Sequence, residues 1–146
     1  MRTEKIITIY PTVIKPGLGV GGYMPPDPLV IVDAYPSSCS FYLTALMYFE
    51  HGKKYTTELD VTFNGESVLP DTNGDENRLE TFMFSPIDNC SVMVGTSLFV
   101  KDIKLIGSGT YDVVYRIFED KEGKLSDVID EQKCALISSI PIRTLA

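Results

Sequence analysis

The chain has 146 residues, a formal net charge of −7 from 13 basic and 20 acidic side chains, and 44% hydrophobic residues. This length and hydrophobic content predict one folded domain, residues 1–146, and argue against a disordered chain. The acidic excess argues against a nucleic-acid-binding protein, which needs lysine and arginine to neutralise phosphates, and against docking on an anionic membrane surface.

The N-terminal run "KIITIYPTVI" predicts a first strand over residues 4–14. Polar residues and Pro11 interrupt it, and no small-residue cleavage site follows, so it does not resemble a signal peptide. Pro11 also places this strand at a sheet edge or a bulge, because proline cannot donate to a ladder of hydrogen bonds. No stretch of the chain approaches the ~20 consecutive apolar residues that span a bilayer.

The segment "KPGLGVGGYMPPDP", residues 15–28, is rich in glycine and proline. Its glycines follow a strand, as in a phosphate-binding fingerprint, but the prolines that come next prevent the helix that such a site requires. Tyr23 and Met24 lie between the glycine half and the proline half. Large side chains on such a loop are typical anchors for a protein partner. The alternative is that Tyr23 folds back and covers one end of the fold.

Residues 28–35 predict a short second strand, and residues 41–49 and 55–63 predict two longer ones. Gly52 supplies a turn between the longer two, which predicts an antiparallel hairpin. One row of the 41–49 strand is apolar throughout: Phe41, Leu43, Ala45, Met47 and Phe49. The opposite row contains Tyr42, Leu46 and Tyr48, and is less polar than a solvated face. We therefore expect another segment, a partner or a second subunit to cover it.

The acidic loop "DTNGDEN", residues 71–77, spaces Asp71, Asn73 and Asp75 like the start of a calcium-binding loop. Glu76 stands where an EF-hand loop needs glycine, and Phe82 stands where it needs its bidentate glutamate. Asx and Gly residues also form ordinary turns. A solvated turn is therefore the favoured interpretation, and calcium binding is the alternative.

The last half of the chain predicts strands near residues 78–86, 91–106 with a break at Gly95, 110–120 and 127–140. The stretch "IKLIGSGTYDVVYRIFED" ends one strand, turns at a Gly-x-Gly, and opens the next strand with Tyr111. This arrangement resembles the tyrosine corner of immunoglobulin-like sandwiches, which implies that the Tyr111 hydroxyl bonds back to the backbone. The chain departs from true immunoglobulin domains because it contains no tryptophan and no cysteine pair placed for the inter-sheet bridge.

Little in the sequence indicates catalysis or metal binding. His51 is the single histidine and lies in a predicted turn, which argues against a His-based triad or a Cys3His zinc site. Adjacent carboxylates, such as Glu119 with Asp120, point to opposite faces of a strand and favour charged strand ends. The same holds for Asp130 with Glu131. The cysteines are odd in number, and we expect reduced thiols in the cytoplasm: Cys39, Cys90 and Cys134.

Together these patterns predict an all-β, antiparallel β-sandwich of seven to eight strands with immunoglobulin-like wiring. We expect a non-enzymatic protein-interaction module without cofactor or metal, which binds a protein partner or a second copy of itself. The expected partner-binding residues are Tyr23, Met24, Tyr42 and Tyr48. The alternative is a sandwich that binds a small ligand or a carbohydrate, assisted by calcium at residues 71–77. A third hypothesis is a hydrolase that uses the loop carboxylates.

Overall fold

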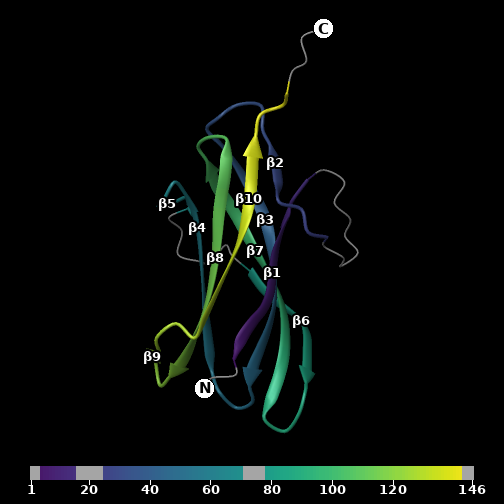
Figure 1. Cartoon of the computed structure of the whole chain (residues 1–146), viewed down its shortest axis with the longest axis vertical. Coiled ribbons are helices and arrows are strands. Elements are labelled where there is room, and N and C mark those ends of the chain that lie inside the picture. The colour runs from purple at the N-terminus through teal and green to yellow at the C-terminus, as the bar shows by residue number, and fades with distance from the viewer. Residues whose placement is uncertain (1–3, 16–24, 71–77, 143–146) are drawn as a thin grey trace.

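The computed structural model describes residues 4–15, 25–70 and 78–142 (Figure 1). Within these ranges the chain forms ten strands: β1 (Lys5–Val13), β2 (Leu29–Ile31), β3 (Ser37–Glu50), β4 (Tyr55–Phe63), β5 (Glu66–Ser67), β6 (Arg78–Pro86), β7 (Ser91–Leu105), β8 (Gly109–Lys121), β9 (Lys124–Leu125) and β10 (Asp130–Ser139). The predicted all-β class is therefore confirmed. The count exceeds the predicted seven to eight because β5 and β9 are two-residue strands beside tight turns.

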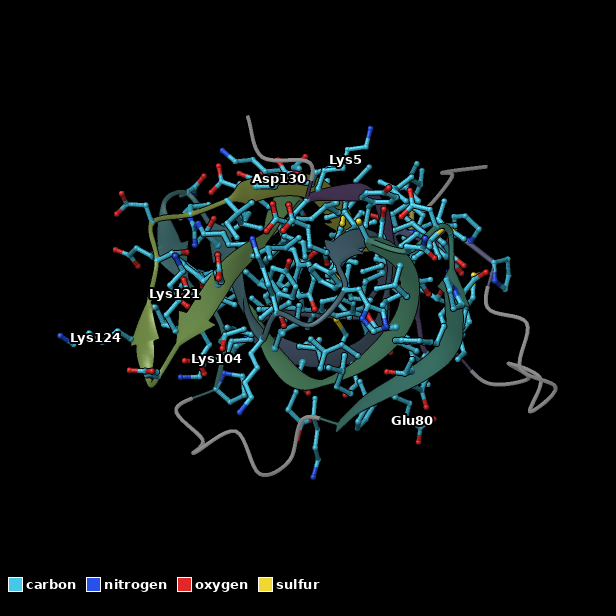
Figure 2. All side chains as sticks on the ribbon, turned by 90° about the horizontal axis from the view of Figure 1, so that it is seen from below. Lys5, Glu80, Lys104, Lys121, Lys124 and Asp130 are labelled. Carbon is cyan, nitrogen blue, oxygen red and sulfur yellow. The ribbon has the colours of Figure 1, made fainter. Side chains whose placement is uncertain are left out.

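The described strands form two sheets that enclose a packed interior (Figure 2). The four-stranded sheet has the order β1-β3-β7-β6 and is antiparallel. The six-stranded sheet has the order β2-β10-β8-β4-β5, with β9 paired to β8. It is mixed because β2 runs parallel to β10, so the expectation of a purely antiparallel fold was wrong at this strand. The arrangement is an open, sandwich-like pair of sheets.

The predicted hairpin of residues 41–49 with 55–63 was wrong. β3 pairs with β1 and β7 in the four-stranded sheet, whereas β4 pairs with β8 and β5 in the other. The turn at residues 51–54 therefore carries the chain from one sheet to the other. β3 is apolar on both faces, which suits a central strand, whereas the polar residues of β4 lie on the outer surface of its sheet.

The core lies between the inner rows of the two sheets. The row of β3 predicted to be buried is buried at every position: Phe41, Leu43, Ala45, Met47 and Phe49. β8 faces it with four buried side chains: Tyr111, Val113, Tyr115 and Ile117. Period-two alternation gives each strand one face to bury, and this burial of apolar area is the main force that holds the sheets together.

β1 closes one side of the fold against β10, and the two strands run side by side in Figure 1. A register shift between Ile6 and Thr8 interrupts the pairing of β1 with β3. Side chains of β10 then bind the backbone of Ile6. The Ile6 N–H donates to Asp130 Oδ2 at 2.7 Å, and Gln132 Nε2 donates to the Ile6 carbonyl at 2.8 Å. These bonds join strands of different sheets. They also supply partners for backbone groups of Ile6, since buried backbone N–H and carbonyl groups need hydrogen-bond partners.

The other irregularity predicted in the sequence, Gly95, does not break a strand, since β7 runs through it from Ser91 to Leu105. Pro11 lies in β1 at the edge of the four-stranded sheet, as predicted. The Pro11 carbonyl accepts a hydrogen bond from the Asp27 N–H at 2.9 Å, and the Val13 N–H donates to the Asp27 carbonyl at the same distance. The chain therefore returns beside β1 before it enters β2.

The predicted tyrosine corner is present. The buried Tyr111 hydroxyl accepts hydrogen bonds from the N–H groups of Ile106 (2.9 Å) and Gly107 (3.1 Å), and donates to the Gly107 carbonyl (2.7 Å). The ring stacks on Phe63 of β4 with centroids 4.4 Å apart. One side chain therefore fixes the path of the β7–β8 turn and packs against the neighbouring strand of its own sheet.

Replacement of Tyr111 by phenylalanine tests this corner. Y111F keeps the stacked ring but leaves two backbone donors without their acceptor, so we expect a loss of about 1–3 kcal/mol in the free energy of unfolding. For a chain of this length the melting temperature falls by about 2–4 °C per kcal/mol. Y48F, at a half-buried position on the sheet surface, is the control. Equal melting temperatures for Y111F and wild type would show that the corner does not stabilise the turn.

Candidate functional site

The outward-facing surface of the four-stranded sheet is unusually apolar. We call it the outer face and define it by six side chains: Tyr42, Leu46 and Tyr48 of β3, Phe82 of β6, and Met93 and Phe99 of β7. Directly opposite pairs in the β3–β7 register are Tyr42 with Phe99, and Tyr48 with Met93. The Tyr42 and Phe99 rings are tilted at 44° with centroids 5.3 Å apart. The outer face thus consists of two apolar groups, Tyr42 with Phe99 and Tyr48 with Leu46, Phe82 and Met93. The uncharged polar pair Thr44–Ser97 lies between them.

A β-bulge in β6 adds side chains to the outer face. Between Thr81 and Met83 the register with β7 shifts, so Phe82 and Met83 together oppose Gly95. The Phe82 ring lies over Gly95, where a Cβ atom would come within 2.8 Å of ring atoms Cε2 and Cζ and 3.1 Å of Leu46 Cδ2. Gly95 therefore provides the space in which the ring lies. Phe82 is nevertheless 55% exposed, so most of the ring remains available for contact.

The outer face carries no charge among the described residues between its margins. Charged residues lie on the two edge strands. Lys5 of β1 pairs with Tyr48, and on β6 Arg78 pairs with Phe99 and Glu80 pairs with Ser97. Figure 2 shows Lys5 and Glu80 on opposite sides of the molecule. An apolar, uncharged area bordered by polar residues is typical of protein–protein interfaces.

The outer surface of the six-stranded sheet is different. Arg116 of β8 donates to Glu131 of β10 at 2.7 Å and to Glu58 of β4 at 3.1 Å, so three neighbouring strands share one ionic row. The hydrogen bond to Glu131, with the smaller contribution of Glu58, raises the pKa of the Arg116 guanidinium. The centre of this surface is therefore ionic, whereas its β2–β10 end carries three exposed apolar side chains, Leu29, Ile31 and Ile137.

Two of the four predicted partner-binding residues, Tyr42 and Tyr48, lie on the outer face, half-buried on β3. Tyr23 and Met24 lie outside the described residues, so their role stays a prediction. Sequence reasoning missed Phe82, Met93 and Phe99. The adjacent apolar pair Phe82–Met83 and the glycine within β7 were the available signals, since both mark bulges and close approaches.

The ends of the Gly/Pro-rich segment are tied together at the edge of the four-stranded sheet. Lys15 Nζ contacts the Asp27 carboxylate at 2.8 Å and 3.0 Å, and this hydrogen bond lowers the pKa of Asp27. The Thr12 hydroxyl donates to the Pro25 carbonyl at 2.7 Å. Thr12 pairs with Tyr42, so the segment re-enters the described chain beside one corner of the outer face.

The remaining sequence candidates do not assemble into a reactive site in the part of the chain that the structure describes. The acidic loop 71–77 lies outside it. In the described residues there is no group of three or more His, Cys, Asp or Glu side chains placed to hold a metal ion. His51 is exposed in the β3–β4 turn, where its N–H donates to the Cys90 carbonyl at 2.7 Å. His51 and Cys90 border an open hollow, whose other lining residues are Tyr48, Glu50, Asp88, Asn89 and Ser91.

The paired carboxylates have structural partners. Asp120 accepts a hydrogen bond from the Gly123 N–H in the β8–β9 turn, whereas its neighbour Glu119 is buried. Asp130 binds Ile6, and Glu131 binds Arg116. The members of each pair thus act at different places, as strand geometry predicts.

Comparisons with protein-family models, with curated proteins and with solved structures find no match to this chain. The described residues also include no helix long and apolar enough to cross a membrane.

The cysteines make a test of burial possible. All three are free, and Cys90 is exposed, whereas desolvation raises the pKa of the Cys39 and Cys134 thiols to about 12. The nucleophile is the thiolate, so at pH 8 the two partly buried thiols present almost no reactive form. We expect a disulfide reagent to titrate one thiol per native chain rapidly, and Cys90→Ser to abolish this phase. Two or more rapid equivalents in the native protein would contradict the described burial.

Proposed function

We propose that this chain is a non-enzymatic protein-interaction module that binds through the outer face of its four-stranded sheet. The observation that carries the proposal is the concentration of aromatic and other apolar side chains on the outer face. The two central strands carry no charge from Tyr42 to Tyr48 and from Met93 to Phe99, and the uncharged pair Thr44–Ser97 separates the two apolar groups. Aromatic side chains and methionine are enriched at protein interfaces, and charged residues are depleted from interface centres. A cytoplasmic location and a single-domain organisation stay predictions.

We further propose that the wiring is immunoglobulin-like. Seven strands remain among the described elements when the three short ones, β2, β5 and β9, are set aside. Their order, β1-β3-β7-β6 in one sheet and β10-β8-β4 in the other, supports the proposal because it corresponds to the A-B-E-D and G-F-C orders of that fold. The corner at Tyr111 supports it too. Val113 occupies the position of the second bridging cysteine, two residues after the tyrosine.

The alternative of a ligand-binding or carbohydrate-binding sandwich stays a prediction, because no described contact favours it over the interaction module. Its calcium component depends on residues 71–77, which the structure does not describe.

A photo-crosslinking amino acid placed at Tyr42 tests the proposed function in cells that express the chain. We expect a covalent adduct with a protein at this position, because the Tyr42 ring lies on the outer face beside Phe99. Ile137, an exposed residue on the outer surface of the six-stranded sheet, is the matched control and should give no such adduct. The additional substitution Phe82→Lys should abolish the adduct at Tyr42. Adducts that form equally at both positions, or at neither, would contradict the proposed face.

A further inference from the structure

We propose that the free edge of β4 is a second binding surface, at which the six-stranded sheet accepts an added strand from a partner protein. The added strand is extended and alternates apolar side chains with basic ones. This surface is separate from the outer face, so the inference goes beyond the proposed function.

The two sheets do not extend equally far across the fold. They are joined at the side where β1 lies beside β10. From that side the four-stranded sheet continues with β3, β7 and β6, whereas the other sheet continues with β8 and β4. β6 therefore has no full-length strand facing it, because β5 adds only two residues beside the end of β4. We call the side between β4 and β6 the open side.

The inner row of β6 is exposed at the open side. Directly opposite residues of an antiparallel sheet share a face, and the register through β7 places Leu79 and Phe84 on the same face as the buried Leu43 and Met47 of β3. Leu79 is nevertheless 51% exposed, and Phe84 is 63% exposed. The facing sheet normally covers such an inner row in a sandwich. A strand added beside β4 would extend the facing sheet over both side chains.

The middle of β4 and the middle of β6 lie at the same level along the strands. Burial raises the pKa of the Tyr115 hydroxyl of β8, and the adjacent hydroxyls of Thr57 on β4 and Thr96 on β7 oppose that increase. Thr96 lies opposite Thr81, which stands between Leu79 and Phe84 in β6. A strand that pairs with the middle of β4 would therefore lie at the height of the exposed row.

β4 has backbone groups available for such pairing. The Val61 carbonyl accepts from the Val68 N–H at 2.8 Å on the side away from β8, so alternate residues of β4 direct their N–H and carbonyl groups to the free edge. Among the described residues, no strand pairs with this edge from Tyr55 to Leu59. β4 has neither a proline nor a register shift, whereas the edge strand β6 has both. β4 is therefore the less protected edge at the open side.

The charges beside this edge define the added strand. Glu58 and Asp60 alternate with the inner row of β4 and lie on the outer surface of the sheet, and the exposed Glu66 of β5 follows them. Arg116 is shared between Glu58 and Glu131, so the surface keeps an excess of negative charge. Opposite charges stabilise cross-strand pairs, and like charges destabilise them.

The partner chemistry follows from these two faces. Lysine or arginine in the outer row of the added strand would lie opposite Glu58 and Asp60, and the net charge of −7 attracts a basic partner. Apolar side chains in its inner row would cover Leu79 and Phe84. In strand addition, main-chain hydrogen bonds supply affinity and alternate side chains supply specificity.

Titration of the purified full chain with a blocked synthetic peptide, in which valine and lysine alternate over the length of β4, tests the inference. Two control peptides group the same residues into a valine half and a lysine half, or replace each lysine by glutamate. We compare wild type with Phe84→Ser and Phe82→Ser, which remove exposed rings, 63% and 55% exposed, from opposite faces of β6. Melting curves confirm that each variant is folded, and Leu79→Ser replaces Phe84→Ser if that variant is not.

We expect the alternating peptide to bind with a dissociation constant below about 1 mM, and both control peptides to bind at least ~10-fold more weakly. Phe84→Ser should raise the dissociation constant at least ~5-fold, because an apolar contact is lost, and Phe82→Ser should leave it within ~2-fold. The bound peptide should slow hydrogen exchange at the Thr57 and Leu59 amides, whereas the Glu58 and Asp60 amides are protected by β8 with or without it.

Four results would overturn the inference: no binding below about 1 mM, equal binding of the three peptides, a larger effect of Phe82→Ser than of Phe84→Ser, or unchanged exchange at Thr57 and Leu59. None of them bears on the crosslink at Tyr42, which tests the outer face separately.

Discussion

Burial of the inner row of β3 is the constraint on which the rest of the structure depends. Side chains alternate between the two faces of a strand, so the register that buries Phe41, Leu43 and Met47 also fixes where their neighbours point. A one-residue slip would expose the whole inner row. The core therefore determines that Tyr42, Leu46 and Tyr48 lie on the opposite side of the sheet. The apolar outer face follows from this register together with the unusual composition of the second row.

Two local irregularities, a register shift in β1 and a bulge in β6, interrupt the regular strand pairing. The shift at Ile6 leaves backbone groups that Asp130 and Gln132 bind, and these bonds close one side of the fold. At the other edge of the four-stranded sheet, the bulge in β6 interrupts the regular pairing and places the Phe82 ring over Gly95. Each irregularity interrupts, at one residue, the alternation of side chains between the two faces of the strand. One of them joins the sheets, and the other places an exposed ring on the outer face.

The sequence was sufficient to predict features that depend on local pattern. The buried rows of β3 and β8, and the corner at Tyr111, follow from period-two alternation and turn chemistry. The pairing of the strands was harder to predict from the sequence. β3 and β4 are joined by a short turn yet belong to different sheets, because the pairing of each is decided by strands distant in sequence. On the outer face, Tyr42 and Tyr48 were predicted, whereas Phe82, Met93 and Phe99 required the register across β3, β7 and β6.

The most direct measurement compares Leu43→Lys with Tyr42→Lys, a charged substitution at two adjacent positions on β3. Leu43 is buried in the core, whereas Tyr42 is half-buried on the outer face. We expect that L43K does not fold cooperatively, since a buried unpaired charge costs more than a domain of this size can tolerate. We expect Y42K to stay folded, to melt within about 5 °C of wild type and to lose binding through the outer face. Unfolding of both variants, or tolerance of both, would contradict the alternation from which the outer face is derived.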